Sequence, residues 1–197
     1  MRIGTPHGPA RAHLHPADDP VGALVLGHGA GGGVSAPDLA GVTKAALERR
    51  ITVALVEQPY RVAGRRSPAP AAQLDVAWIA VVEKLAAGPL EGLALACGGR
   101  SSGARVACRT AAATGAQAVL CLAFPVHPPG RPEKTRLDEL DGVKAPVLVV
   151  QGDSDPFGMP PERRARTILV VEGNHSLRKG IATYAATVAD WLAARLG

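Results

Sequence analysis

Short runs of apolar residues alternate along the chain with longer segments in which apolar residues recur at helical spacing. The apolar runs end in turn-forming or polar residues and predict strands at 23–26, 51–56, 93–97, 118–123, 147–150 and 168–171. These runs are continuously apolar rather than alternating, as expected for strands buried on both faces of a parallel sheet. The pattern therefore predicts a mostly parallel central sheet.

Amphipathic segments lie between and after these runs and predict helices at 37–50, 73–87, 102–114 and 180–196. Alternating strands and helices indicate an α/β fold with helices on both faces of the sheet. Residues 1–16 are expected to add an antiparallel pair at one sheet edge. With no repeat or interdomain linker, residues 1–197 are expected to form a single domain, with Pro-rich loops at 67–70 and 125–132.

Composition narrows the class of protein further. Hydrophobic residues make up 47% of the chain but aromatic residues only 3%, so the core is expected to consist of Ala, Val and Leu. Three cysteines, an odd number, lie within apolar segments, which predicts buried, reduced thiols and a cytoplasmic location. The first residues lack the apolar run of a signal peptide, and no apolar stretch is long enough for a membrane span.

The net charge of +5 raises the question of nucleic-acid binding. However, the arginines are scattered singly or in pairs, and the chain has few aromatic residues for stacking on bases. We therefore expect a small-molecule partner rather than nucleic acid or a membrane, and a monomer or homodimer.

A nucleophile-elbow pattern follows the third apolar run, at Gly99-Arg100-Ser101-Ser102-Gly103. In such an elbow the serine occupies a strained turn between strand and helix, and glycines two positions to either side remove Cβ atoms that would clash. Ser102 cannot take this role, because Arg100 and Ala104 flank it at those positions. The alternative is an ordinary glycine turn in which a serine caps the helix.

Candidate partners for Ser101 follow later strands, in the order acid then histidine. Asp153 and Asp155 come after the strand at 147–150, and His175 after the strand at 168–171. His175 is expected to accept the Ser101 proton, and an aspartate to hold the imidazole in the correct tautomer. Asp155 is favoured because it lies farther along its loop, whereas Asp153 is placed to cap a turn.

An oxyanion hole requires two backbone N–H groups that converge on one carbonyl oxygen. One is expected from Ser102 at the start of a helix, and the other from the glycine-rich segment at 28–33, with Ala30 preferred and Gly31 next. His28 is expected to orient this segment.

At these residues the chain resembles an α/β-hydrolase of the dienelactone-hydrolase-like kind. More narrowly, it resembles the compact branch that includes a hydrolase-like domain of an animal histone-acetyltransferase (NSL) complex subunit. The resemblance rests on segments 27–31, 99–103, 124–129, 151–158 and 174–177. It implies a serine hydrolase with Ser101, Asp155 and His175 as the catalytic residues and no cofactor. Dienelactone hydrolases use a cysteine nucleophile, so their activity does not simply transfer to a chain with serine at position 101.

The segment at 124–145 is too short for a separate lid domain, so an open, shallow site is expected. Arg100, His127 and His28 are candidate substrate-binding residues, and several further arginines (Arg61, Arg65, Arg66 and Arg131) follow strand ends. One hypothesis is an anionic substrate. The alternative is that Arg100 supports neighbouring loops while the other cations are solvated.

Three other interpretations compete with a serine hydrolase cleaving an ester, thioester or related acyl bond. A hydrolase-fold protein without activity could bind a partner or ligand. A dinucleotide site is suggested by Gly27-His28-Gly29-Ala30-Gly31-Gly32 and Glu57, but it leaves Ser101, Asp155 and His175 unexplained. His13 and His15 are expected on one face of a strand with His7 nearby, which suggests a zinc site. A third well-placed ligand is missing, so no metal is expected.

Overall fold

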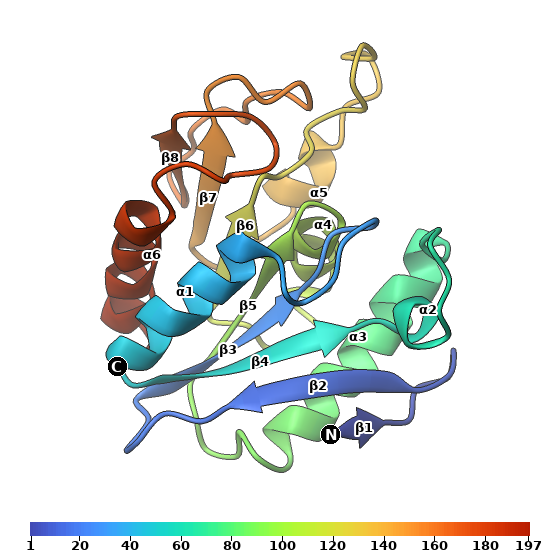
Figure 1. Ribbon diagram of the computed structural model, residues 1–197, viewed down its shortest axis with the longest axis vertical. Coiled ribbons are helices and arrows are strands. Elements are labelled where there is room, and N and C mark those ends of the chain that lie inside the picture. The colour runs from blue at the N-terminus through green and yellow to red at the C-terminus, as the bar shows by residue number, and fades with distance from the viewer.

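Eight strands form a single sheet in the order β1-β2-β4-β3-β5-β6-β7-β8 (Figure 1). The computed structural model describes residues 1–197. The strands are β1 (Arg2–Ile3), β2 (Ala10–His15), β3 (Gly22–Gly27), β4 (Ile51–Glu57), β5 (Leu95–Arg100), β6 (Ala118–Leu122), β7 (Val147–Gly152) and β8 (Arg166–Val171). The helices are α1 (Pro37–Glu48), α2 (Pro59–Val62), α3 (Ala71–Ala86), α4 (Ser102–Thr110), α5 (Leu137–Asp141) and α6 (Ile181–Leu196).

All pairings among β3 to β8 are parallel, whereas β2 runs antiparallel to both β4 and β1. The predicted parallel sheet and its antiparallel edge pair are therefore both confirmed. Because the parallel strands share one direction, the loops that follow β3, β5, β7 and β8 meet at the same edge of the sheet. These loops and the first residue of α4 together contain every residue of the predicted catalytic triad and oxyanion hole.

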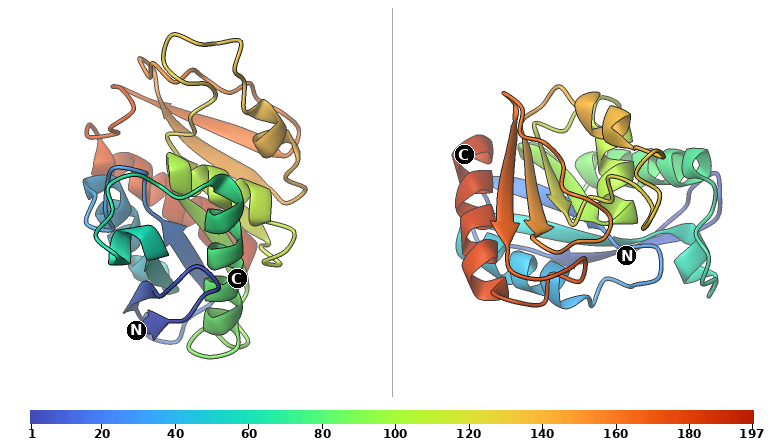
Figure 2. Two further views of the ribbon diagram at one scale, coloured as in Figure 1. Left: turned by 90° about the vertical axis from the view of Figure 1, so that its right-hand side faces the viewer. Right: turned by 90° about the horizontal axis from the view of Figure 1, so that it is seen from above.

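Two hydrophobic cores fill the spaces on either side of the sheet. One contains Leu39 and Val42 of α1 together with Val188 of α6, and the other contains Trp78 of α3 and Val106 of α4. Figure 2 shows the same division, with α1 and α6 on one face and α3, α4 and α5 on the other. This layering explains why the central strands are continuously apolar, since both of their faces are covered.

The structure differs from the predicted elements chiefly at β5 and α2. β5 continues through Gly98 and Gly99 to Arg100, although the two glycines predicted its end. Gly98 lies where a Cβ would be 2.5 Å from the Leu120 carbonyl oxygen, so its lack of a side chain permits close strand packing. α2 was not predicted, because four residues are too few to show helical periodicity.

The segment between β6 and β7 carries only the five-residue helix α5. No separate lid domain is inserted there, as the sequence predicts. No inserted domain therefore covers the edge of the sheet at which β5, β7 and β8 end.

Candidate active site

Ser101 occupies the turn between β5 and α4 in a conformation that residues other than glycine rarely adopt. Its φ and ψ are 52° and −108°, and its N–H donates to the Leu122 carbonyl on β6 at 2.8 Å. A Cβ on Gly103 would lie 2.5 Å from the Gly27 carbonyl oxygen, and one on Gly99 would lie 2.7 Å from the same atom. The two glycines therefore let α4 pack closely enough on β3 and β5 to hold the strained serine.

A continuous chain of hydrogen bonds joins Ser101 to His175 and Asp155. The distance from Ser101 Oγ to His175 Nε2 is 2.9 Å, and that from His175 Nδ1 to Asp155 Oδ2 is 2.8 Å. Because a carboxylate only accepts, Nδ1 carries the proton toward Asp155 and Nε2 is left to accept from the serine hydroxyl. The structure thus brings together three residues that are widely separated in the sequence.

Asp155, rather than Asp153, is the carboxylate that contacts the imidazole. Its side chain is 1% exposed, and its second oxygen, Oδ1, accepts the Phe157 N–H at 2.9 Å. Asp153 instead accepts the Gly173 N–H at 3.0 Å, which ties the loop after β7 to the loop after β8. This bond joins two loops, whereas the sequence suggested that Asp153 caps its own turn.

Two residues that sequence reasoning missed support the Asp155–His175 pair. Gln151, buried at the end of β7, donates to Asp155 Oδ2 at 2.8 Å. The Phe157 ring stacks on the His175 ring with centroids 4.1 Å apart. A glutamine inside an otherwise apolar strand was the available signal for Gln151, since a buried amide requires partners.

Arg100 connects the turn that holds Ser101 to two neighbouring segments. Its Nε lies 2.8 Å from Asp38 Oδ2 on α1, and its Nη2 donates to the His175 carbonyl at 3.0 Å. Burial raises the pKa of the Asp38 carboxyl above its ordinary value, and the adjacent Arg100 charge opposes that rise. Both contacts fit the hypothesis that Arg100 supports neighbouring loops, and its contact with substrate stays a prediction.

The glycine-rich loop after β3 lies beside Ser101 and is held by buried side chains. Among the protein's hydrogen bonds, the N–H groups of Ala30 and Ser102 have no acceptor, and Tyr60 donates to the Ala30 carbonyl at 3.0 Å. A Cβ on Gly29, the residue before Ala30, would lie 3.7 Å from Ser101 Cβ, which places this loop against the serine. Free N–H groups on both the loop and α4 are what an oxyanion site requires.

His28 lies beneath this loop with both ring nitrogens engaged. Nδ1 donates to the Gly29 carbonyl at 2.8 Å, and Nε2 accepts the Gln58 N–H at 3.1 Å. The residue is 3% exposed, and burial lowers the pKa of its imidazole. This geometry fits the expected loop-orienting role and leaves no ring nitrogen for a substrate, so we do not retain His28 as a substrate-binding candidate.

His127 lies against the segment that carries Asp155. Its N–H donates to the Phe157 carbonyl at 3.1 Å, and its Nδ1 donates to the Pro128 carbonyl at 2.9 Å. A Cβ on Gly158 would lie 2.6 Å from its Nε2. The structure thus places His127 beside the 155–158 loop, while its contact with substrate stays a prediction.

The competing sequence features lie away from this cluster. His13 Nε2 lies 3.0 Å from Glu57 Oε2, and Arg11 Nη1 lies 3.5 Å from the same oxygen. Glu57, the acid that the dinucleotide interpretation requires, therefore pairs with side chains of β2. No group of three or more His, Cys, Asp or Glu side chains is arranged to hold a metal ion.

Comparison with known proteins identifies the family. A family profile described as an alpha/beta hydrolase domain matches residues 20–189. The chain belongs to the alpha/beta-hydrolase family. No curated protein sequence matches this hydrolase-family chain.

Three solved structures align with this alpha/beta-hydrolase chain over nearly the whole length of both chains. XC6422 from Xanthomonas campestris, a serine hydrolase without a lid, aligns with a TM-score of 0.78 and 21% identity over 100% of this chain and 94% of that one. A dienelactone hydrolase from Anabaena variabilis aligns with a TM-score of 0.80 and 16% identity, over 100% of this chain and 97% of that one. Est1E from Butyrivibrio proteoclasticus aligns with a TM-score of 0.80 and 16% identity, over 99% of this chain and 98% of that one.

At these identities the likeness establishes the α/β-hydrolase fold. The narrower resemblance to the histone-acetyltransferase subunit stays a prediction. The three cysteines are free and buried, as expected, and the cytoplasmic location inferred from them also stays a prediction. None of the helices of this alpha/beta hydrolase is long and apolar enough to cross a bilayer.

Proposed function

We propose that this protein is a serine hydrolase that cleaves a small ester, thioester or related acyl bond through an acyl-enzyme intermediate. The observation that carries the proposal is the hydrogen-bonded chain Ser101–His175–Asp155, with 2.9 Å and 2.8 Å between the donor and acceptor atoms. A serine, a base and an orienting carboxylate in this arrangement form a nucleophilic triad.

In the first half of the reaction, Ser101 Oγ attacks the substrate carbonyl carbon while its proton passes to His175 Nε2. The resulting imidazolium is stabilised by Asp155, which accepts the Nδ1–H and stays ionised. The negative charge that develops on the carbonyl oxygen is stabilised by the N–H groups of Ala30 and Ser102. His175 then donates its proton to the leaving oxygen or sulfur as the bond from the carbonyl carbon to that atom breaks.

In the second half, water replaces the leaving group. His175 accepts a proton from the water as its oxygen attacks the acyl carbon, and the bond to Ser101 Oγ breaks as the proton returns to the serine. The products are a carboxylic acid and the alcohol or thiol released earlier. No cofactor is required for this chemistry.

The substrate is proposed to be small and to bind without strong charge recognition. The short β6–β7 segment provides no lid domain to enclose a long acyl chain. The Arg100 charge, the one closest to Ser101 in the chain, is matched by Asp38 at 2.8 Å. These features favour a compact, uncharged acyl group over an anionic one.

The decisive experiment combines fluorophosphonate labelling, read by intact-mass spectrometry, with hydrolysis of p-nitrophenyl acetate. Wild type is expected to gain one adduct and to hydrolyse the ester. Ser101→Ala should show no adduct and lose at least about 1,000-fold in kcat. The matched control is Ser102→Ala, which keeps the backbone N–H and should retain labelling and most of the activity.

A folded wild-type protein that neither labels nor hydrolyses any ester in a panel of acetyl to hexanoyl esters and thioesters would overturn the proposal. In that case a non-catalytic binding role for the fold would take its place.

A further inference from the structure

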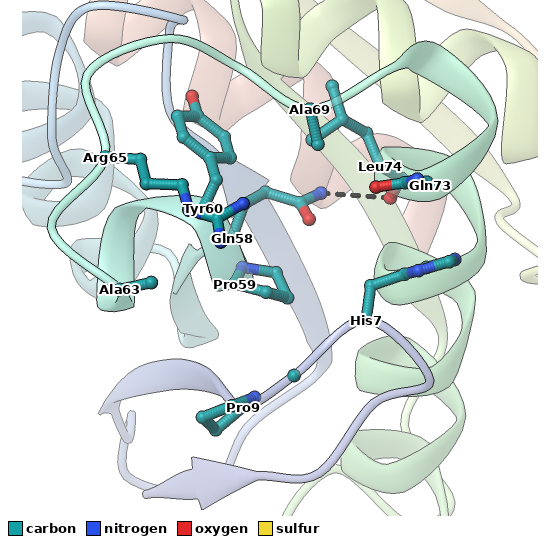
Figure 3. A pocket seen from close by; sticks show the side chains of 11 residues that line it. His7, Pro9, Gln58, Pro59, Tyr60, Ala63, Arg65, Ala69, Gln73 and Leu74 are labelled. Carbon is teal, nitrogen blue, oxygen red and sulfur yellow. Dashed lines mark hydrogen bonds between the residues drawn. The ribbon is translucent and has the colours of Figure 1, made fainter.

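A pocket lies between the loop that joins β1 to β2, the segment that follows β4 and the start of α3 (Figure 3). Its volume is about 260 Å³, and Ser101, Asp155 and His175 are not among its lining residues. Pockets for drug-sized ligands usually measure about 300–1,000 Å³, so this one suits a smaller molecule.

Gln58 gives this pocket a buried polar group without a partner. The residue is 6% exposed, and its side-chain Nε2 donates to the Leu74 carbonyl at 3.1 Å. Its Oε1 accepts no hydrogen bond in the protein. Figure 3 shows this oxygen turned into the space bordered by Pro59 and His7. Because buried acceptors are nearly always satisfied, the pocket is suited to a ligand that brings a hydrogen-bond donor.

The electrostatic character of the pocket indicates what else the ligand carries. Arg65 lies on one side and His7 on the other, and no acidic side chain is among the lining residues. Gln73 and Leu74 belong to the first turn of the sixteen-residue helix α3, whose N-terminus carries partial positive charge. Arg65 on one side of the pocket and the α3 N-terminus on the opposite side both favour a ligand that carries a carboxylate.

We propose that this pocket binds a small carboxylic acid that also carries a hydroxyl or amide donor. The carboxylate pairs with Arg65, and the donor supplies the missing hydrogen bond to Gln58 Oε1. The apolar walls formed by Pro59, Ala69 and Leu74 accommodate a compact hydrocarbon or aromatic body.

The pocket is connected to the glycine-rich loop through two of its own residues. The Gln58 N–H donates to His28 Nε2 at 3.1 Å, and the Tyr60 hydroxyl donates to the Ala30 carbonyl at 3.0 Å. Occupancy would fix Gln58 and Tyr60 and thereby the Ala30 peptide. An effect of the ligand on kcat follows from this connection and rests on the proposed function, whereas binding itself does not.

Isothermal titration calorimetry with 4-hydroxybenzoate as the probe tests binding directly, with benzoate and 4-hydroxybenzyl alcohol as probes that lack the donor and the carboxylate. Wild type is expected to bind 4-hydroxybenzoate at least about tenfold more tightly than either comparison probe. Arg65→Ala should weaken the binding by at least about tenfold, and Gln58→Leu should abolish the preference for 4-hydroxybenzoate over benzoate. Arg66→Ala, which removes a neighbouring exposed arginine outside the pocket lining, is the matched control and should bind as wild type does.

Ser101→Ala separates this proposal from the proposed function, because it should lose hydrolysis and retain probe binding. Thermal unfolding without probe establishes that each variant is folded, and Arg65→Ala, altered at an exposed side chain, decides the question if Gln58→Leu does not fold. The proposal is overturned if wild type shows no binding of any of the three probes at a probe concentration of about 10 mM. It is equally overturned if Arg65→Ala binds as tightly as wild type, or if Ser101→Ala loses binding.

Discussion

Gln151 donates a hydrogen bond to the same Asp155 oxygen that accepts the His175 Nδ1–H, and both distances are 2.8 Å. Gln151 Nε2 also lies 3.1 and 2.8 Å from the carbonyl oxygens of Phe124 and Gly158, so its two hydrogens are shared among three acceptors. One buried side chain on β7 therefore fixes both the Asp155 carboxylate and the loop that carries it. The orientation of the imidazole depends on a residue that does not contact Ser101.

Replacing Gln151 with methionine preserves its approximate volume and removes these hydrogen bonds. We expect kcat for p-nitrophenyl acetate to fall by up to about 100-fold, because small displacements of a catalytic group are costly. KM should change little, since Gln151 lies behind Asp155 rather than against the substrate. Gln117→Met, at an exposed position, is the control. A folded Gln151→Met protein with wild-type kcat would show that the amide has no positioning role.

Arg100 offers a test of substrate charge. If it supports loops, Arg100→Gln should lower kcat/KM for a neutral ester and for an anionic ester, such as p-nitrophenyl hemisuccinate, by the same factor. The variant should also lose about 3 kcal/mol of stability in urea unfolding, because Asp38 is left buried and unpaired. A selective loss of activity toward the anionic ester would mean instead that Arg100 binds substrate.

The sequence was sufficient to predict the parallel sheet and the meeting of Ser101, Asp155 and His175 at one edge. Both follow from strand polarity: continuous apolar runs predict parallel strands, and the residues that follow such strands share an edge. Asp155 was favoured over Asp153 because it lies farther along its loop, and it is the carboxylate that contacts His175.

The supporting contacts were not predictable in the same way. The stacking of Phe157 on His175 joins two loops. The Arg100–Asp38 pair joins the end of β5 to the first turn of α1, and the sequence pattern does not indicate that these two element ends meet. Residues in loops carry no periodicity from which their neighbours can be inferred. The sequence predicted that β5 ends before Gly98, because glycine usually indicates a turn. In the structure the strand continues, and the missing side chain of Gly98 permits close contact with β6.

Gly103 provides a test of the packing that holds the turn at Ser101. In Gly103→Ala the new methyl group would lie 2.5 Å from the Gly27 carbonyl oxygen and 2.9 Å from the His28 carbonyl oxygen, and backbone cannot yield cheaply. We expect a loss of more than about 2 kcal/mol in unfolding free energy, or no folded protein. Gly31→Ala is the matched control, because no atom lies within 4 Å of the position that its new methyl group would occupy, and it should unfold as wild type does. Equal midpoints for the two variants would contradict this account of the close approach between β3 and α4.

His28 predicts how stability depends on pH. Burial lowers the pKa of its imidazole below the ordinary value of 6.5, so between the two values the unfolded chain binds more protons than the folded one. Stability from this group is therefore complete above the unfolded pKa and is lost as pH falls below it, by at most about 1.4 kcal/mol per pH unit. The raised pKa of Asp38 acts in the opposite direction, since it favours the folded state more as pH falls. Urea unfolding at pH 7, 6 and 5 should therefore show a smaller acid loss in His28→Gln, which does not titrate and retains an acceptor for the Gln58 N–H, than in wild type. Asp38 is present in both proteins, so its contribution cancels in the difference, and identical acid losses would mean that the buried imidazole does not set this dependence.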